Sequence, residues 1–241
     1  MRTSSSPVSS ATDEVDPAPR ALLALALIVP APSLGVIAAM VLWPGSTGAA
    51  IFFFLCKVWM LALPVLWRVF IDRRPLSFSP IRSGGVIVGA VLGVAISGVV
   101  LLSYQLLGES WVDDDYVREM ATNNGIGTPA LFLGAVVYWV LVNSVLEEYV
   151  YRWFIYEKCG VVMPPMAAVL ASAACFTVHH VIAIRMQFDW NVTVLASIGV
   201  FVGGAVWSWL YLRYRSIWPG YISHAIVDIA VFWVGWRIIF G

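Results

Sequence analysis

Charged residues are scarce in this sequence, at 12% of 241 positions, against roughly 25% in soluble globular proteins. Hydrophobic residues make up 61%, and the mean hydropathy is +0.86. This composition excludes a soluble globular domain and predicts an all-α, polytopic membrane helix bundle. The formal net charge is zero, so the charge balance indicates neither nucleic acid nor an acidic partner.

Cysteine is also scarce. The three cysteines, Cys56, Cys159 and Cys175, are odd in number and form no Cys-x-x-Cys pair. This pattern disfavours a disulfide framework. We expect the three thiols to be buried as small hydrophobic side chains.

Long apolar runs fill the chain after a polar beginning. Residues 1–20 are rich in Ser, Pro and acidic residues, which predicts a disordered tail. Residues 21–241 are predicted to form a single integral-membrane domain, because they divide into about seven stretches near the ~20 residues that span a bilayer. An eighth, re-entrant or interfacial piece around residues 184–190 stays open. The expected spans are 21–43, 48–71, 84–107, 129–157, 161–184, 191–212 and 217–240.

The sequences of two of these spans predict local features of helix shape and packing. Pro30 and Pro32 predict a kink in the first span, because proline removes a backbone donor and clashes with the preceding turn. The third span carries small residues at four-residue spacing, which allow another helix to approach closely, within the monomer or between monomers. These residues are Gly85, Gly89, Gly93 and Ser97.

The distribution of basic residues predicts the orientation. Seven spans with a cytoplasmic N-terminus put every basic loop inside and the acidic loop of residues 109–119 outside, although Arg185 and Arg237 then fall outside. We therefore expect an integral protein of the plasma (inner) membrane. The basic loops contain Arg73, Arg74, Arg82, Lys158, Arg213 and Arg215.

Ionisable residues inside the fourth span need an explanation, because a charge at the bilayer centre costs roughly 2.5–3.5 kcal/mol on insertion scales. Glu148 and Arg152 are one helical turn apart, a spacing that suits an ion pair. The charge of Glu147 is then less well balanced by a nearby cation, which makes Glu147 a candidate general base. The alternative is a charge cluster at the cytoplasmic helix end that reaches water. Glu157 and Lys158 mark a later end of this helix, which disfavours that alternative.

Two further polar clusters lie in the fifth and seventh spans. His180 follows Phe176 by one turn, while His179 points about 100° away from His180 and is interpreted as a supporting or packing residue. His224 and Asp228 share a helical face, so the aspartate can orient the imidazole. Each cluster alone also fits a polar group that joins two helices.

The three candidate residues lie at different depths along their helices, which is a difficulty for a single shared site. Glu147, His224 and His180 differ by about 14 Å in distance from their helix ends at 1.5 Å per residue. Parallel upright helices cannot bring them together. We therefore expect tilted or broken helices, or a later start of the fifth span.

The three clusters together resemble the CAAX protease and bacteriocin-processing (CPBP, or Abi) family of intramembrane proteases, which includes the CAAX prenyl endopeptidases. The family pattern is Glu-Glu-x-x-x-Arg, then Phe-x-x-x-His, then His-x-x-x-Asn or Asp. The chain matches it with Glu147, Glu148 and Arg152, with Phe176 and His180, and with His224 and Asp228. The resemblance covers about residues 130–235, the family-like protease core.

The resemblance implies an intramembrane endopeptidase. In that interpretation Glu147, assisted by His180, activates a water, and His224 with residue 228 stabilises the oxyanion. Glu148 and Arg152 would hold the site in shape. One departure matters, because the prenyl endopeptidases carry Asn at the position of Asp228. An ionised Asp cannot donate to an oxyanion, so it must be protonated, orient His224 or help to bind a metal.

A divalent metal ion such as zinc is a second possibility for the site. Glu147, His180 and His224 have the residue types of a catalytic zinc site with an open position, although the resemblance does not settle whether a metal is present.

Other intramembrane protease classes fit poorly. The sequence has no His-Glu-x-x-His, no complete Gly-x-Ser-Gly and no paired aspartate motif of the presenilin kind.

The substrate expected from the resemblance is a membrane-embedded peptide or a lipidated protein, prenylated or bearing a leader, met in the lipid bilayer. Two alternatives from other classes use the same buried polar residues. One is a proton-coupled transporter, although the two halves show no matching pair of broken segments. The other is a non-catalytic immunity or scaffold protein, which should tolerate Gln at position 147.

Overall fold

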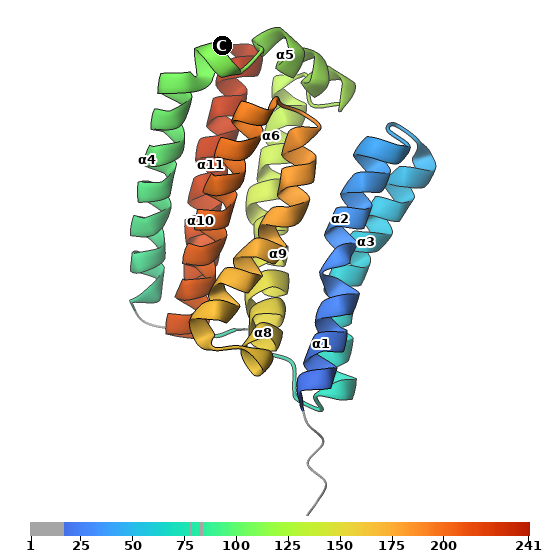
Figure 1. The fold of residues 1–241 in the computed structure, drawn as a ribbon. Coiled ribbons are helices and arrows are strands. Elements are labelled where there is room, and N and C mark those ends of the chain that lie inside the picture. The colour runs from blue at the N-terminus through green and yellow to red at the C-terminus, as the bar shows by residue number, and fades with distance from the viewer. Residues whose placement is uncertain (1–16, 78, 82–83) are drawn as a thin grey trace, which may run out of the picture.

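The computed structural model describes residues 17–77, 79–81 and 84–241 (Figure 1). Residues 1–16 of the expected tail and Arg82 lie outside the described residues. The described part is helical without strands, since a chain in lipid must satisfy its backbone polar groups internally. Seven stretches are long and apolar enough to cross a membrane, which confirms the predicted helix bundle. They are Pro17–Leu42, Thr47–Ile71, Gly85–Gly108, Pro129–Val162, Pro165–Arg185, Trp190–Tyr214 and Trp218–Phe240.

The first span is interrupted at Pro30. It consists of α1 (Pro17–Ile28), α2 (Pro30–Ile37) and the π-helical segment η1 (Ala38–Leu42). Val29 keeps a helical backbone, with φ −61° and ψ −39°, and the hydrogen-bond ladder is interrupted where Pro30 cannot donate an N–H. The span begins at Pro17, earlier than the expected residue 21, so the end of the predicted tail is already helical.

The second and third spans are followed by a short helix, which leads from the third span to the fourth. They comprise α3 (Thr47–Leu66) with η2 (Trp67–Ile71), and α4 (Gly85–Trp111). The acidic loop contains α5 (Asp114–Asn123), which was not predicted. Its N-cap residue, Asp113, accepts a hydrogen bond from the backbone N–H of Tyr116.

The fourth span is the longest and the least regular. It extends to Val162, beyond the expected end at residue 157, because Glu157 and Lys158 begin a last helical turn instead of ending the helix. Two π-helical segments flank the residues of interest, a feature frequent at functional sites. The segments are α6 (Pro129–Tyr138), η3 (Trp139–Asn143), α7 (Ser144–Glu148), η4 (Tyr149–Tyr156) and α8 (Glu157–Val162).

The last three spans are α9 (Pro165–Arg185), α10 (Trp190–Tyr214) and α11 (Trp218–Phe240). Between α9 and α10 the chain makes a tight turn, in which the N–H groups of Gln187 and Phe188 both bond to the carbonyl of Ile184. The chain around residues 184–190 is therefore a turn, and it adds no eighth span. Figure 1 shows α9 running obliquely, in contrast to the steeper α4.

The small-residue stripe of α4 packs against α11. A Cβ atom on Gly89 would collide with the carbonyl of Pro219, and one on Gly93 would lie 2.9 Å from the backbone of Ser223. Ser97 Oγ donates to the carbonyl of Ile226 over 3.2 Å. The stripe is therefore used within the monomer, where it positions the helix that carries His224 and Asp228.

Replacing Gly89 with Ala is expected to destabilise the protein by about 1–3 kcal/mol, the usual cost of overpacking, because the backbone of α11 has to move. Thermal unfolding of the detergent-solubilised protein measures the effect. The matched control is Gly98→Ala on the same helix, where a Cβ atom meets nothing within 4 Å. Equal unfolding temperatures for the two variants would contradict this account of the α4 and α11 contact.

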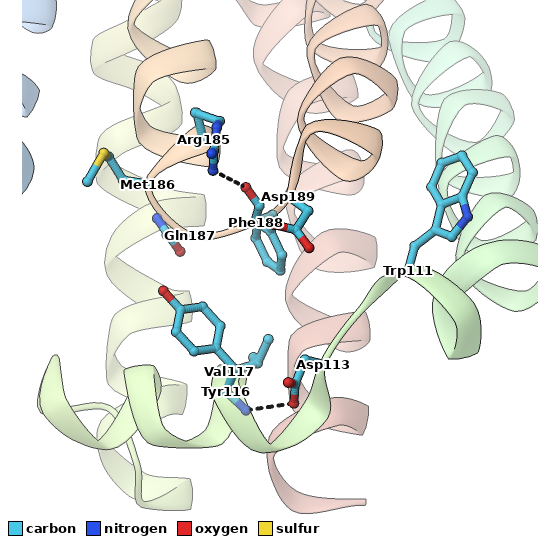
Figure 2. A pocket seen from close by; sticks show the side chains of 9 residues that line it. All are labelled: Trp111, Asp113, Tyr116, Val117, Arg185, Met186, Gln187, Phe188 and Asp189. Carbon is cyan, nitrogen blue, oxygen red and sulfur yellow. Dashed lines mark hydrogen bonds between the residues drawn. The ribbon is translucent and has the colours of Figure 1, made fainter.

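Cavities lie at both ends of the bundle. One of about 510 Å³ is lined by residues of α1, η2 and the chain after it, η4, α8 and the start of α9, together with Arg215. The other, of about 240 Å³, lies between the start of α5 and the turn after α9, where Arg185 donates to the carbonyl of Phe188 (Figure 2). Neither of these two cavities is lined by a residue of the three motifs.

Candidate active site

The acidic motif of the fourth span is buried inside the bundle. Glu147 is 5% exposed, and Glu148 and Arg152 are both 0% exposed. These values exclude the alternative of a charge cluster that reaches water from a helix end. The three side chains therefore form a buried polar cluster inside an apolar helix bundle.

Glu148 forms the centre of a buried network. Its Oε1 atom lies 3.5 Å from Arg152 Nε, so the pairing expected from the spacing is present. The same oxygen lies 3.2 Å from Nδ1 of His224 on α11. The Arg152 guanidinium lies over the rings of Phe176 at 4.7 Å and Trp207 at 5.3 Å. This network links the fourth, fifth, sixth and seventh spans around one ion pair.

Gly220 allows α11 to approach this network. A Cβ atom at this position would collide with Glu148 Oε2. Any larger residue there would push the carboxylate away from His224.

Glu147 lies on the adjacent side of the helix. Its Oε2 atom is 3.8 Å from His224 Nε2. Its side chain also hydrogen-bonds with Asn143, which accepts a hydrogen bond from Lys57 Nζ over 2.9 Å. A lysine of α3 is therefore connected to Glu147 through one buried amide.

The hydrogen bonding of His180 defines its tautomer. His180 Nδ1 lies 2.8 Å from the carbonyl oxygen of Phe176. A carbonyl only accepts, so Nδ1 carries the hydrogen and Nε2 keeps its lone pair in the neutral ring. The Phe-x-x-x-His spacing therefore supplies an imidazole with its basic nitrogen free for a proton or a ligand.

His179 lies closer to the site than the sequence indicated. Ligating atoms of Glu147, His179 and His180 all lie within 4.8 Å of one another. His179 Nδ1 also lies 3.1 Å from the hydroxyl of Tyr151, and the two rings are stacked. His179 therefore has the expected packing contacts, and it also presents a nitrogen to the acidic side chain.

His224 is held from several sides. In addition to both glutamates, Asp228 Oδ1 lies 3.7 Å from its Nε2 atom. The other oxygen of Asp228 is 2.6 Å from Ser144 Oγ, which also lies 2.8 Å from the carbonyl of Trp139. Trp207 stacks on the imidazole with ring centroids 3.9 Å apart and planes 15° apart. The ring orientation is thus fixed before any substrate binds.

Sequence reasoning missed several of these partners. Lys57 had a usable signal, since a charged residue within an apolar span is as costly there as Glu147 is. Ser144 and Trp207 had none, because a serine or a tryptophan in a membrane helix is ordinary. Their contacts depend on how the spans pack.

The donor types of Glu147, His179 and His180 fit a divalent ion such as zinc. Zinc bonds of about 2.0–2.1 Å bring tetrahedral ligand atoms to about 3.3 Å from one another, so the side chains would have to close from their present separation. His224 is not in this group, although its Nε2 lies 3.8 Å from Glu147 Oε2. The ammonium of Lys57 acts electrostatically on the same three side chains and opposes a bound cation.

Comparison with known proteins agrees with the motifs. Residues 129–230 match the family model described as type II CAAX prenyl endopeptidase Rce1-like. No curated protein and no solved structure matches the chain. The matched segment runs from the start of α6 into α11 and contains all seven motif residues. Residues 129–230 of this integral membrane protein are therefore similar to the type II CAAX prenyl endopeptidase Rce1-like family, in agreement with the three motifs.

Proposed function

We propose that this protein is an intramembrane endopeptidase that hydrolyses a peptide bond of a membrane-associated substrate. The observation that supports this function is that three spans meet at Glu147, whose carboxylate lies 3.8 Å from His224 Nε2 and within 4.8 Å of a ring nitrogen of His180. Their proximity removes the difficulty of depth along the helices. The π-helical segments beside Glu147 and the oblique course of α9 account for it physically.

Water activation is assigned to Glu147 with His180. Glu147 accepts a proton from water while the water oxygen bonds to the scissile carbonyl carbon, and His180 Nε2 accepts a hydrogen bond from the same water. The tetrahedral intermediate then expels the amine. The C–N bond breaks, and the proton held by Glu147 passes to the leaving nitrogen.

Stabilisation of the oxyanion is assigned to His224. With Nδ1 bonded to Glu148, the ring presents an Nε2–H to the oxyanion when it is protonated. Asp228 lies beside Nε2, and its other oxygen is fixed by Ser144. We therefore assign Asp228 to the orientation of His224, in place of direct donation by the Asn of the prenyl endopeptidases. Glu148 and Arg152 hold the ring and the helices in place.

The proposed substrate is a membrane-anchored peptide. Because of the family match, a peptide with a prenylated C-terminus is the first candidate to test. The test uses the full-length protein in proteoliposomes and two peptides of one CAAX sequence, with a farnesylated or an unmodified cysteine. We expect release of the C-terminal tripeptide from the farnesylated peptide. Absence of release from both would overturn the prenyl substrate, and equal release from both would show that the lipid is not recognised.

For a divalent ion such as zinc we propose Glu147, His179 and His180 as ligands. When bound, such an ion makes a coordinated water more acidic and polarises a carbonyl. His179→Gln is expected to weaken zinc binding at least about tenfold, since it removes a ligand, while His224→Gln leaves the affinity nearly unchanged. Calorimetric titration of the purified protein measures both. The reverse order would restore His224 as the third ligand, and absence of zinc binding to the native protein would exclude the site.

We also propose a plasma-membrane location with the N-terminus in the cytoplasm. The end of the bundle at which α1 begins contains Arg20, Arg68, Arg74, Lys158 and Arg215. The opposite end contains α5 with its run of aspartates (Figure 1). This asymmetry is the one that the positive-inside rule describes.

A further inference from the structure

The basic end of the bundle contains a cavity whose charge nothing in the catalytic cluster explains. Among the described residues, five cationic and two anionic side chains line it, a net charge of +3. They come from α1, from η2 and the chain after it, from the η4 and α8 junction, and from the residue after α10. In Figure 1 this is the lower end, where α1 begins and α8 ends. Several segments distant in sequence thus direct positive charge into one volume of about 510 Å³.

Part of this charge is already used. Lys158 Nζ lies 2.6 Å from Asp72 Oδ2, and Glu157 accepts a hydrogen bond from the hydroxyl of Tyr211 over 2.7 Å. Arg68 donates to the carbonyl of Pro75 and lies over the ring of Trp153. Both acidic residues of the cavity are therefore committed to other partners.

The remaining arginines have no acidic partner within the part of the chain that the structure describes. Among residues 17–77, 79–81 and 84–241, no carboxylate forms an ion pair with Arg20, Arg74 or Arg215. All three are exposed. Positive charges that face one another across a cavity repel, and an anion between them removes that repulsion.

Arg215 lies at the C-terminal end of α10 and lines the cavity. The residue caps α10 in the left-handed region, with φ 50° and ψ 39°. Glycine or asparagine usually occupies such a C-terminal position, because other residues are strained there.

Apolar side chains beside the arginines indicate the kind of anion. Ile71 and Val161 line the same cavity and are 42% and 45% exposed. A free inorganic anion gains nothing from such neighbours. A phospholipid places its phosphate against the arginines and its acyl chains along the apolar residues, and basic pockets between membrane helices bind lipid headgroups in this way.

We propose that this cavity binds the phosphate headgroup of an anionic phospholipid. Arg20, Arg74 and Arg215 contact the phosphate, and Ile71 and Val161 contact the first part of the acyl chains. The lipid holds α1 against α8 and the start of α9, so it stabilises the ends of the helices that carry Glu147 and His180. The proposal does not depend on the protease assignment.

The test compares two double variants of the full-length protein that lose the same charge at the same end of the bundle. Arg74→Gln with Arg215→Gln removes two arginines from the cavity. Arg73→Gln with Arg213→Gln removes their exposed neighbours, which do not line it. Native mass spectrometry measures the binding of phosphatidylglycerol and phosphatidylcholine to each purified protein.

We expect the native protein and the Arg73 and Arg213 variant to prefer phosphatidylglycerol. The Arg74 and Arg215 variant is expected to lose affinity for it by about 30-fold, from roughly a fivefold contribution of each arginine. An equal loss in both variants would overturn the proposal, since it would show general surface attraction. Displacement of the lipid by equimolar inorganic phosphate would also overturn it, because the site would then bind a free anion.

Discussion

Glu147→Gln is expected to lower the rate of peptide hydrolysis at least about 100-fold, the usual contribution of a general base. The amide keeps the size of the side chain and its contact with Asn143, but it cannot accept the proton of the attacking water. His180→Ala is expected to have a loss of similar size. Because the two residues activate one water, the double variant should be little worse than either single variant. Rates of cleavage in the proteoliposome assay measure all three.

A matched control separates this effect from loss of structure. Glu119→Gln changes an exposed glutamate of α5 and should retain the native rate. Each variant should also elute as the native protein does in size-exclusion chromatography. If the losses of the single variants multiplied in the double variant, Glu147 and His180 would be acting in separate steps.

Arg152→Met is expected to destabilise the fold by about 3–5 kcal/mol, because it leaves Glu148 buried without its cation. Methionine preserves much of the volume between Phe176 and Trp207, so a cavity contributes little. Adding Glu148→Gln should recover a large part of the loss, since a neutral pair at this position has no unbalanced charge. Denaturant unfolding of the solubilised protein measures the free energy of unfolding.

The control for this prediction is Arg213→Met, which removes an exposed arginine from the end of α10 and should cost little. The pairing account fails if the double variant is as unstable as Arg152→Met alone. In that case Arg152 would act through its contacts with the aromatic rings and not through Glu148.

The sequence was informative about the membrane spans because a bilayer imposes a simple length and composition rule. Span limits were less accurate where polar residues looked like helix ends. Glu157 and Lys158 have partners in the structure, Tyr211 and Asp72, so the helix continues through them to Val162. The helix α5 was missed because its polar residues lie outside the hydrophobic runs.

The site was predictable to the extent that its contacts lie within one helix. The Glu148 and Arg152 pair follows from their spacing, as does the proximity of His180 to Phe176. The position of His179 depends on π-helical geometry and on how α9 crosses the fourth span, which helical periodicity does not contain. The stacking of Trp207 on His224 likewise depends on the packing of α10 against α11.

The transporter and scaffold alternatives make a different prediction for the same residues. A scaffold that keeps its buried network should tolerate Gln at position 147, because the amide preserves the shape of the site. A transporter should lose transport but generate no new peptide ends. Proteolysis alone leaves a chemical product that can be sequenced.

The most direct test is therefore N-terminal peptide profiling of membranes from cells that carry the native protein or Glu147→Gln at matched expression. Our account predicts peptide termini that are present with the native protein and absent with the variant, and their sequences would identify the substrate. Identical profiles, with the variant inserted and folded as the native protein is, would contradict the protease assignment.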